Sequence, residues 1–419
     1  MRLRTHRVAG LATATALGVV MSFAAALSAA AQDKTEITFS YLWGGAEAQA
    51  LEGIIADFNA SQDKIVVKGV SSPDGTKQLA SMSSANGAFD ISDNFGGNVG
   101  AWASKGILAP LDDLGLDTKD FVPAAVAQVT YDGKLYSVPI AVHDYQLIYN
   151  KKLLADAGVE PPKTMDELAA AIKATTKVDG SGNITQIGLG SAYLPLTMEM
   201  FGNAFGADWN AGGKPTPNDP NAIKGINFYV DNVVTPYTTA AVNKFIAGYG
   251  PYMSPQDPFA TGKMAMVIDG EWRSASLGAV QGLDWGATAI PAASADLANS
   301  TIVEVSTMFI PTNSKHKAEA GVFLKYFVSP PVMTKFTRAL GNLPARTSLL
   351  GDPAYADLPN YSVWLNALKS PNAKSFSSAP YVSEYTADLA SAFDAIMQGS
   401  QTAADALKGV ADRSSSYAQ

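Results

Sequence analysis

The stretch EITFSY at residues 36–41 alternates apolar and polar residues, as a strand with one buried face does. Residues 46–59 follow it, and their apolar positions recur at helical spacing: Leu51, Ile54, Ile55 and Phe58. Residues 64–70 then alternate again. Strand, helix and strand in this order predict the start of a parallel α/β sheet.

The same alternation continues along the chain. A helix is predicted near 76–84, a strand near 89–93 and a helix near 99–105, which gives an α/β unit with helices on both faces of its sheet. Thr164 and Glu167 form a capping box, so a helix is expected from Thr164 to about Lys177. Further segments are predicted as a strand at 184–189, an exposed loop at 208–221, and helices at 318–327, 331–340 (ended by Gly341), 384–397 and 403–412.

The composition bounds the class of protein. The 419 residues are 47% apolar and 16% charged, which excludes a disordered chain and predicts two or three compact units. The chain has no cysteine, so it has no thiol nucleophile, no thiolate metal site and no cysteine for an N-terminal lipid anchor.

The N-terminus has the pattern of a targeting signal. Arg2, Arg4 and Arg7 precede an uncharged stretch that ends in three alanines at 29–31, a pattern typical of a cleaved signal peptide over residues 1–31. A membrane anchor is the competing interpretation, because the stretch is long enough to span a bilayer. Cleavage would leave 27 basic and 38 acidic residues, a formal charge of −11, which argues against a nucleic-acid partner.

Four motifs occur in series along the chain. They are GKLYSVPIAV at 133–142 with LIYNKKL at 147–153, FATGKMAM at 259–266 with DGEW at 269–272, SKHKA at 314–318, and GNLPAR at 341–346. Together they resemble the extracellular solute-binding proteins of family 1, the carbohydrate-binding proteins of ABC importers, of which the maltose-binding type is the familiar member.

The resemblance implies a two-lobed α/β fold, the type II periplasmic-binding-protein fold. Lobe 1 would comprise residues 32–141 and 305–346, and lobe 2 residues 142–304 and 347–419. It further implies a monomer in the periplasm that captures a carbohydrate between its lobes and delivers it to permease subunits in the membrane. No catalytic residue, metal or cofactor is expected.

Two tryptophans are candidate sugar platforms, since sugars present flat apolar faces to aromatic rings. Trp43 ends the first predicted strand, where ligands of open α/β sheets bind, and Glu47 lies nearby, although an acid in the first turn of a helix needs no ligand. Trp272 follows Gly270 and stands where the family pattern has a stacking Trp. A core or interface position is its alternative.

Other candidates have equally plain structural alternatives. Asn94 lies in a glycine-containing loop that could be a solvated turn, whereas His143 and Asp144 are expected on the first crossing between the lobes. Arg346 could bind an oxygen-rich or anionic ligand or form a salt bridge between the lobes. The resemblance places aromatics of the second lobe at Tyr193 and at Tyr381 or Tyr385.

One segment departs from the family pattern. Such proteins often have a glycine pair between 301 and 311, where this chain reads VEVSTM at 303–308. The side chain of Glu304 or Ser306 would then contact the ligand in place of backbone.

A secreted carbohydrate-active hydrolase is the rival function, since its cleft would also hold aromatics and acids. Hydrolysis needs two carboxyl groups flanking one bond, and Asp269 and Glu271 do not converge on an extended chain. The chain has no phosphate-binding loop, so the transporter's ATPase would be another chain. A structural Ca²⁺ and a chemoreceptor partner stay open.

Overall fold

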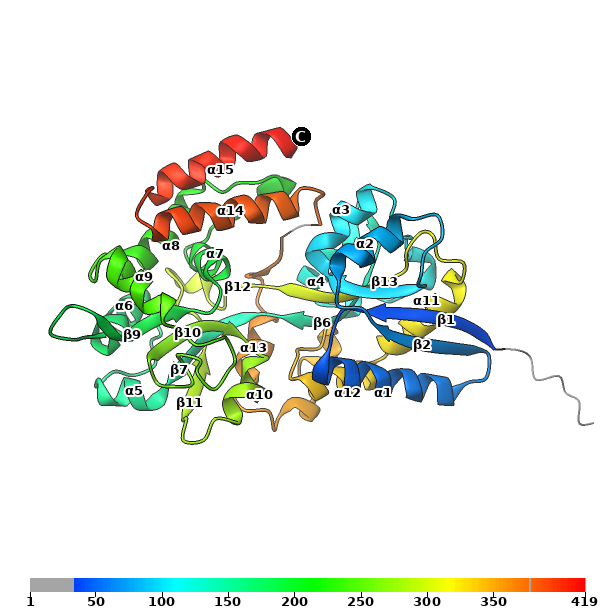
Figure 1. The fold of residues 1–419 in the computed structure, drawn as a ribbon, viewed down its shortest axis with the longest axis horizontal. Coiled ribbons are helices and arrows are strands. Elements are labelled where there is room, and N and C mark those ends of the chain that lie inside the picture. Colours follow the sequence, from blue (N-terminus) through cyan, green and yellow to red (C-terminus); the bar gives the residue numbers. More distant parts are fainter. Residues whose placement is uncertain (1–33, 377, 419) are drawn as a thin grey trace, which may run out of the picture.

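The computed structural model describes residues 34–376 and 378–418, so the predicted signal peptide lies outside the described residues. Within them the chain forms two five-stranded sheets, which lie in the two halves of Figure 1. In these residues no helix combines the length and the apolar character needed to cross a membrane.

The first sheet contains the N-terminal strands. Its order is β2 (Ile65–Ser71), β1 (Thr35–Tyr41), β3 (Ile91–Phe95), β13 (Glu304–Phe309) and β6 (Val138–His143). β1 pairs in parallel with both β2 and β3, which confirms the predicted parallel start, and β13 runs antiparallel to β3 and β6. β3 begins two residues later than the predicted strand near 89–93.

Helices cover both faces of the first sheet, as predicted. In Figure 1 α1 and α12 lie along one face and α2 and α3 along the other. Ile37 and Phe39 of β1 and Ile54 of α1 are fully buried, because the apolar alternation of the strand meets the apolar stripe of the helix. The helices are α1 (Gly45–Ser61), α2 (Gly75–Ser83), α3 (Val99–Ser104), α4 (Pro123–Val129), α11 (Lys317–Phe327) and α12 (Pro330–Leu340).

The second sheet is mixed. Its order is β11 (Trp285–Thr288), β7 (Tyr145–Asn150), β10 (Met264–Gly270), β9 (Ile184–Ser191) and β8 (Lys177–Val178). β10 is parallel to β9 and antiparallel to β7. Every residue of β10 is buried, which explains its unbroken apolar run.

The remaining helices surround the second sheet, and α14 and α15 lie beside α7 and α8 (Figure 1). They are α5 (Lys151–Asp156), α6 (Met165–Thr175), α7 (Leu194–Ala204), α8 (Pro220–Tyr229), α9 (Thr239–Ala247), α10 (Arg273–Gly278), α13 (Ser362–Ala367), α14 (Val382–Met397) and α15 (Ala403–Tyr417). Thr164 and Glu167 make the predicted capping box, but α6 ends before Lys177, because Lys177 pairs with β9.

Two one-residue crossings lead out of the first sheet, one to the second sheet and one to a separate two-stranded sheet. Asp144 alone separates β6 of the first sheet from β7 of the second, and Val303 alone separates β12 (Thr301–Ile302) from β13. β12 pairs with β14 (Ala373–Lys374), and a small hairpin is formed by β4 (Thr130–Tyr131) and β5 (Lys134–Leu135). The crossings bring the last residues of β6 and the first of β13 to the boundary between the sheets.

The segment 208–221 is only partly the exposed loop that was predicted. Trp209 is 5% exposed and packs edge-on against Phe393 of α14, with ring centroids 6.2 Å apart. A short 3₁₀ helix follows at Ala211–Gly213, and Pro220 begins α8. The absence of periodicity did not reveal a single buried anchor, since one tryptophan is enough to hold a loop against a core.

Candidate functional site

A cavity of about 640 Å³ lies where the two sheets meet, and side chains from both sheets line it. The sequence predicted eight site residues, and five of them line this cavity: Trp43, Glu47, His143, Tyr193 and Trp272. Residues far apart in the chain converge here because β1, β6 and β10 all end at this boundary. This placement follows the rule that ligands of α/β sheets bind beyond the strand ends.

His143 ends β6 and stands on the floor of the cavity. Its Nδ1 lies 2.7 Å from Oε1 of Glu271, and its Nε2 lies 2.9 Å from the hydroxyl of Ser306. Burial lowers the pKa of His143, but the Glu271 carboxylate outweighs this effect and raises that pKa overall. The imidazole is therefore held from both sides, and it links β6 to β13 and to the residue that follows β10.

Trp272 lies at the end of β10 with its ring edge-on to two other rings. The centroid distance is 5.6 Å to His143 and 5.6 Å to Tyr145. A side chain at Gly270 would collide with the Trp272 ring, so only glycine permits this position. Trp272 is half-buried and lines the cavity, which leaves part of its ring open to a ligand.

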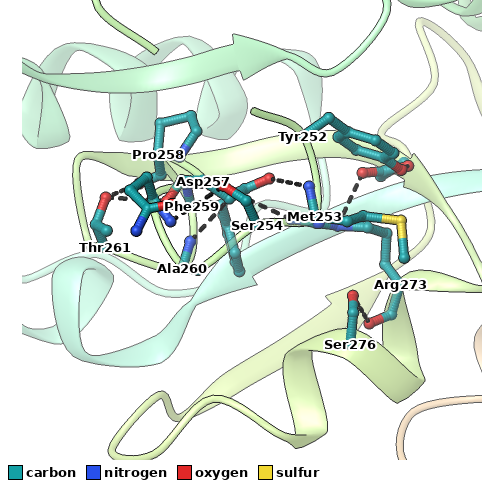
Figure 2. A network of polar contacts seen from close by, with 12 residues as sticks. Tyr252, Met253, Ser254, Asp257, Pro258, Phe259, Ala260, Thr261, Arg273 and Ser276 are labelled. Carbon is teal, nitrogen blue, oxygen red and sulfur yellow. Dashed lines mark hydrogen bonds and ion pairs between the residues drawn. The ribbon is translucent and has the colours of Figure 1, made fainter. Parts of the chain in front are cut away.

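A polar network behind Trp272 holds it in place, and Figure 2 shows part of this network. The indole Nε1 of Trp272 donates to the hydroxyl of Tyr252 at 2.8 Å, and that hydroxyl donates to Oδ1 of Asp269 at 2.8 Å. The Arg273 guanidinium contacts two buried carboxylates, Asp269 at 3.0 Å and Asp257 at 3.2 Å. Burial raises the pKa of Asp269 to about 7, although Arg273 acts against this rise.

The loop at 252–257 completes the same network. The guanidinium carbon of Arg273 lies 5.0 Å from the centroid of the Tyr252 ring, and the backbone N–H of Met253 donates to Asp257 at 3.1 Å. Met253 has a φ of 59°, which is uncommon for a residue with a side chain. Tyr252 and Met253 both line the cavity, and sequence reasoning missed them because their loop has no periodicity.

The first sheet contributes the opposite wall. Trp43 packs against Phe336 of α12 with ring centroids 6.4 Å apart, and the exposed Glu47 lies in the first turn of α1. Phe95 ends β3, lines the cavity and is 52% exposed. The exposed ring of Phe95 therefore offers an aromatic face to a ligand in the cavity.

β13 supplies the polar edge of the cavity. Glu304 and Ser306 both line it, as the departure from the glycine pair suggested, since residues two apart on a strand share a face. Oε2 of Glu304 accepts a hydrogen bond of 2.5 Å from the hydroxyl of Tyr145. Tyr145 also lines the cavity. It was not predicted as a site residue, because a position in the apolar strand β7 is typical of the core.

Three predicted site residues lie outside the lining of this cavity. Asn94 is buried, donates a hydrogen bond to Gln78 of α2 and accepts one from Asn98, which follows β3. Asp144 is fully buried and accepts a hydrogen bond from Gln146. Arg346 forms an ion pair with Asp120 at 2.8 Å, and both residues lie within the predicted lobe 1, so this contact is a salt bridge but not the inter-lobe one that was the alternative.

The cavity combines aromatic rings with carboxylates. No Lys or Arg lines it, and within residues 34–376 and 378–418 no group of three His, Cys, Asp or Glu side chains is placed to hold a metal ion. Aromatic faces suit the C–H surface of a sugar ring, and carboxylate oxygens suit its hydroxyl groups. The arrangement is suited to binding a polyhydroxylated solute.

Known proteins resemble the chain in sequence and in fold. A family described as bacterial extracellular solute-binding protein matches residues 53–363. The maltotriose-binding protein of Pyrococcus abyssi is 26% identical over 62% of this chain and 55% of its own length. The diacetylchitobiose-binding protein DasA of Streptomyces coelicolor is 28% identical over 59% of this chain and 58% of its own length.

Among solved structures, CpMnBP1 with mannobiose bound has a TM-score of 0.73 and 25% identity, and covers 91% of this chain and 100% of its own. The likeness in fold therefore spans nearly the whole chain. In sequence, by contrast, the chain spans only a little over half the length of the two curated relatives.

Proposed function

The chain belongs to the bacterial extracellular solute-binding proteins, and on this premise we propose that it captures a carbohydrate between its two sheets and delivers it to the membrane permease of an ABC importer. The observation that carries the proposal is the pair of tryptophans, Trp43 on one wall of the cavity and Trp272 on the other. Two aromatic rings on opposite walls can hold a sugar ring between them.

The polar residues of the cavity support the same ligand class. Glu47 and Glu304 offer carboxylate oxygens to sugar hydroxyls, and Ser306 offers a hydroxyl. Maltotriose, diacetylchitobiose and mannobiose appear in the names of the similar proteins, and all three are carbohydrates. The location that matches this function is the periplasm, which the protein would reach by export with cleavage of a signal peptide at 1–31.

The purified protein should bind at least one sugar of a small panel and leave it unchanged. Mannobiose, maltotriose and diacetylchitobiose are the probes, and isothermal titration calorimetry should show one site per chain. Mass spectrometry after prolonged incubation should recover the intact sugar. Cleaved product would favour a secreted hydrolase instead, and the lack of any binding across the panel would contradict the carbohydrate assignment.

The lobes should close when the sugar binds. We propose that residues 32–141 with 305–346 move against residues 142–304 with 347–419, and that Asp144 and Val303 lie in the hinge. A solute that touches both lobes binds the closed form better, so it shifts the population toward that form. Small-angle scattering should give a smaller radius of gyration with a saturating sugar than without it, and no change with a panel sugar that does not bind. An unchanged radius would favour a pocket within one rigid body.

A further inference from the structure

A second, smaller compartment adjoins the cavity between the sheets. It has a volume of about 230 Å³ and lies among α7, α14 and the start of β13. Phe95, Tyr193, Leu196 and Glu304 line both spaces, so the two are adjacent parts of one cleft. A ligand longer than one ring could therefore extend from the tryptophans into this compartment.

Glu199 of α7 is the unexplained group in the compartment. Glu199 is only 6% exposed, and it is one of the residues that line the space. Across residues 34–376 and 378–418, no hydrogen bond or ion pair is formed by this carboxyl. Buried carboxyl groups are almost always paired, because burial without a hydrogen-bond or charge partner is unfavourable. An unpaired carboxyl facing a cavity points to a ligand group that pairs with it.

The charges around the compartment indicate whether the ligand group that pairs with Glu199 is positive or negative. Glu304 is the second acid in the lining, and neither space has a Lys or Arg among its lining residues. His143 of the larger space is already paired with Glu271. An anionic sugar would find no cation here. A metal ion is not favoured either, because the described part of the chain offers no cluster of three suitable ligands.

We propose that this compartment receives a protonated amine of the sugar, held between the carboxylates of Glu199 and Glu304. The aromatic ring of Tyr193, 63% exposed, lines the same space and can attract a cation through its face. The assignment rests on the proposed carbohydrate function and narrows it to amine-bearing sugars. Neutral sugars would fill the larger space with lower affinity.

Binding of such an amine should release a proton. Burial, reinforced by the charge of Glu304, raises the pKa of Glu199 to about 8, so Glu199 is mostly protonated at pH 7 in the free protein. The other titratable groups that face it are the hydroxyls of Tyr193 and Tyr385. An ammonium group stabilises the carboxylate form and lowers the pKa of Glu199, and the proton then leaves to the buffer.

The test compares sugars that differ only in one kind of group. The glucosamine trimer is paired with cellotriose, and the 1-amino-1-deoxy alditols of maltotriose and mannotriose are paired with the corresponding alditols. Titration calorimetry at pH 6.5 should show at least one amine-bearing sugar binding about tenfold or more tightly than its hydroxyl partner. Repeating the titration at pH 7 in buffers of different ionisation enthalpy should show proton release for that amine only.

Two variants locate the effect. E199Q keeps the shape of the side chain and removes its charge, so the ratio of amine to hydroxyl affinity should fall about tenfold. E384Q is the matched control, because Glu384 is an exposed acid on α14 that does not line either space, and the ratio should stay unchanged. The proton-release measurement on the unmodified protein gives an independent readout if E199Q folds poorly.

The outcomes separate the inference from the function on which it rests. If hydroxyl sugars bind and no amine binds more tightly, the amine assignment is wrong and carbohydrate capture stands. If neither class binds, both are wrong. An unchanged ratio in E199Q would place amine recognition elsewhere and would also overturn the assignment.

Discussion

Replacing Arg273 by Met should lower the free energy of unfolding by about 3–5 kcal/mol, the effect expected when one partner of a buried ion pair is removed. Arg273 is 2% exposed, and its guanidinium stands between the buried carboxylates of Asp257 and Asp269. Met matches much of the volume of Arg but leaves both carboxylates without a cation. Urea denaturation followed by circular dichroism measures the loss.

The effect of R273M should depend on pH. In the variant Asp269 is buried without the cation that now lowers its pKa, so this pKa stays above the ordinary Asp value of about 4 and rises further. Above that pH the folded variant binds more protons than its unfolded chain, and its stability falls as pH rises. The deficit relative to the unmodified protein should therefore be larger at pH 8 than at pH 5.

R338M is the matched control for R273M. Arg338 forms a two-point ion pair with Asp357 at 2.8 and 3.0 Å, but both side chains are partly exposed. Ion pairs of this kind contribute at most about 1 kcal/mol. Equal losses in the two variants would show that burial of the Arg273 network adds nothing to stability.

Much of the fold could be predicted because the relevant patterns are local. The alternation at 36–41 and the helical spacing after it depend only on which face of each element is buried, and β1 and α1 follow that pattern. Thr164 caps α6 and Gly341 ends α12 with a φ of 70°, since both residues act through their own backbone. Element ends differ more from the prediction: α15 continues to Tyr417, beyond the predicted end near 412.

The residues of the site could be predicted from the sequence only where they lie near the end of a predicted strand. Trp43 and Trp272 each lie two residues after the end of a strand, β1 and β10 respectively. The ends of these two strands meet at the cavity. Tyr252 and Glu199 reach the cleft from a loop and from the interior of α7. Their positions depend on how segments distant in the sequence pack together. The spacing of residues along the chain does not reveal such packing.

Trp272→Ala should weaken sugar binding tenfold or more while the protein stays folded. A stacked aromatic contributes about 0.5–1.5 kcal/mol beyond its buried area, and the area lost on truncation adds to this, whereas tenfold in affinity corresponds to about 1.4 kcal/mol. Aromatic residues at the centre of a binding site often carry the largest share of the affinity. Calorimetry with the panel sugar that binds the unmodified protein measures the loss.

The variant Trp272→Phe separates the ring from its hydrogen bond. Phe keeps a flat aromatic face toward the cavity but cannot donate to the hydroxyl of Tyr252, as the indole of Trp272 does. If stacking is the main contribution, W272F should retain most of the affinity that W272A loses. If instead W272F binds as weakly as W272A, Trp272 acts chiefly by positioning Tyr252. The Arg273 guanidinium lies over the ring of Tyr252, and Tyr252 itself lines the same cavity. Unchanged affinity in both variants would contradict a ligand contact at Trp272, because a half-buried ring that lines the binding cavity cannot be removed without loss if the sugar rests on it.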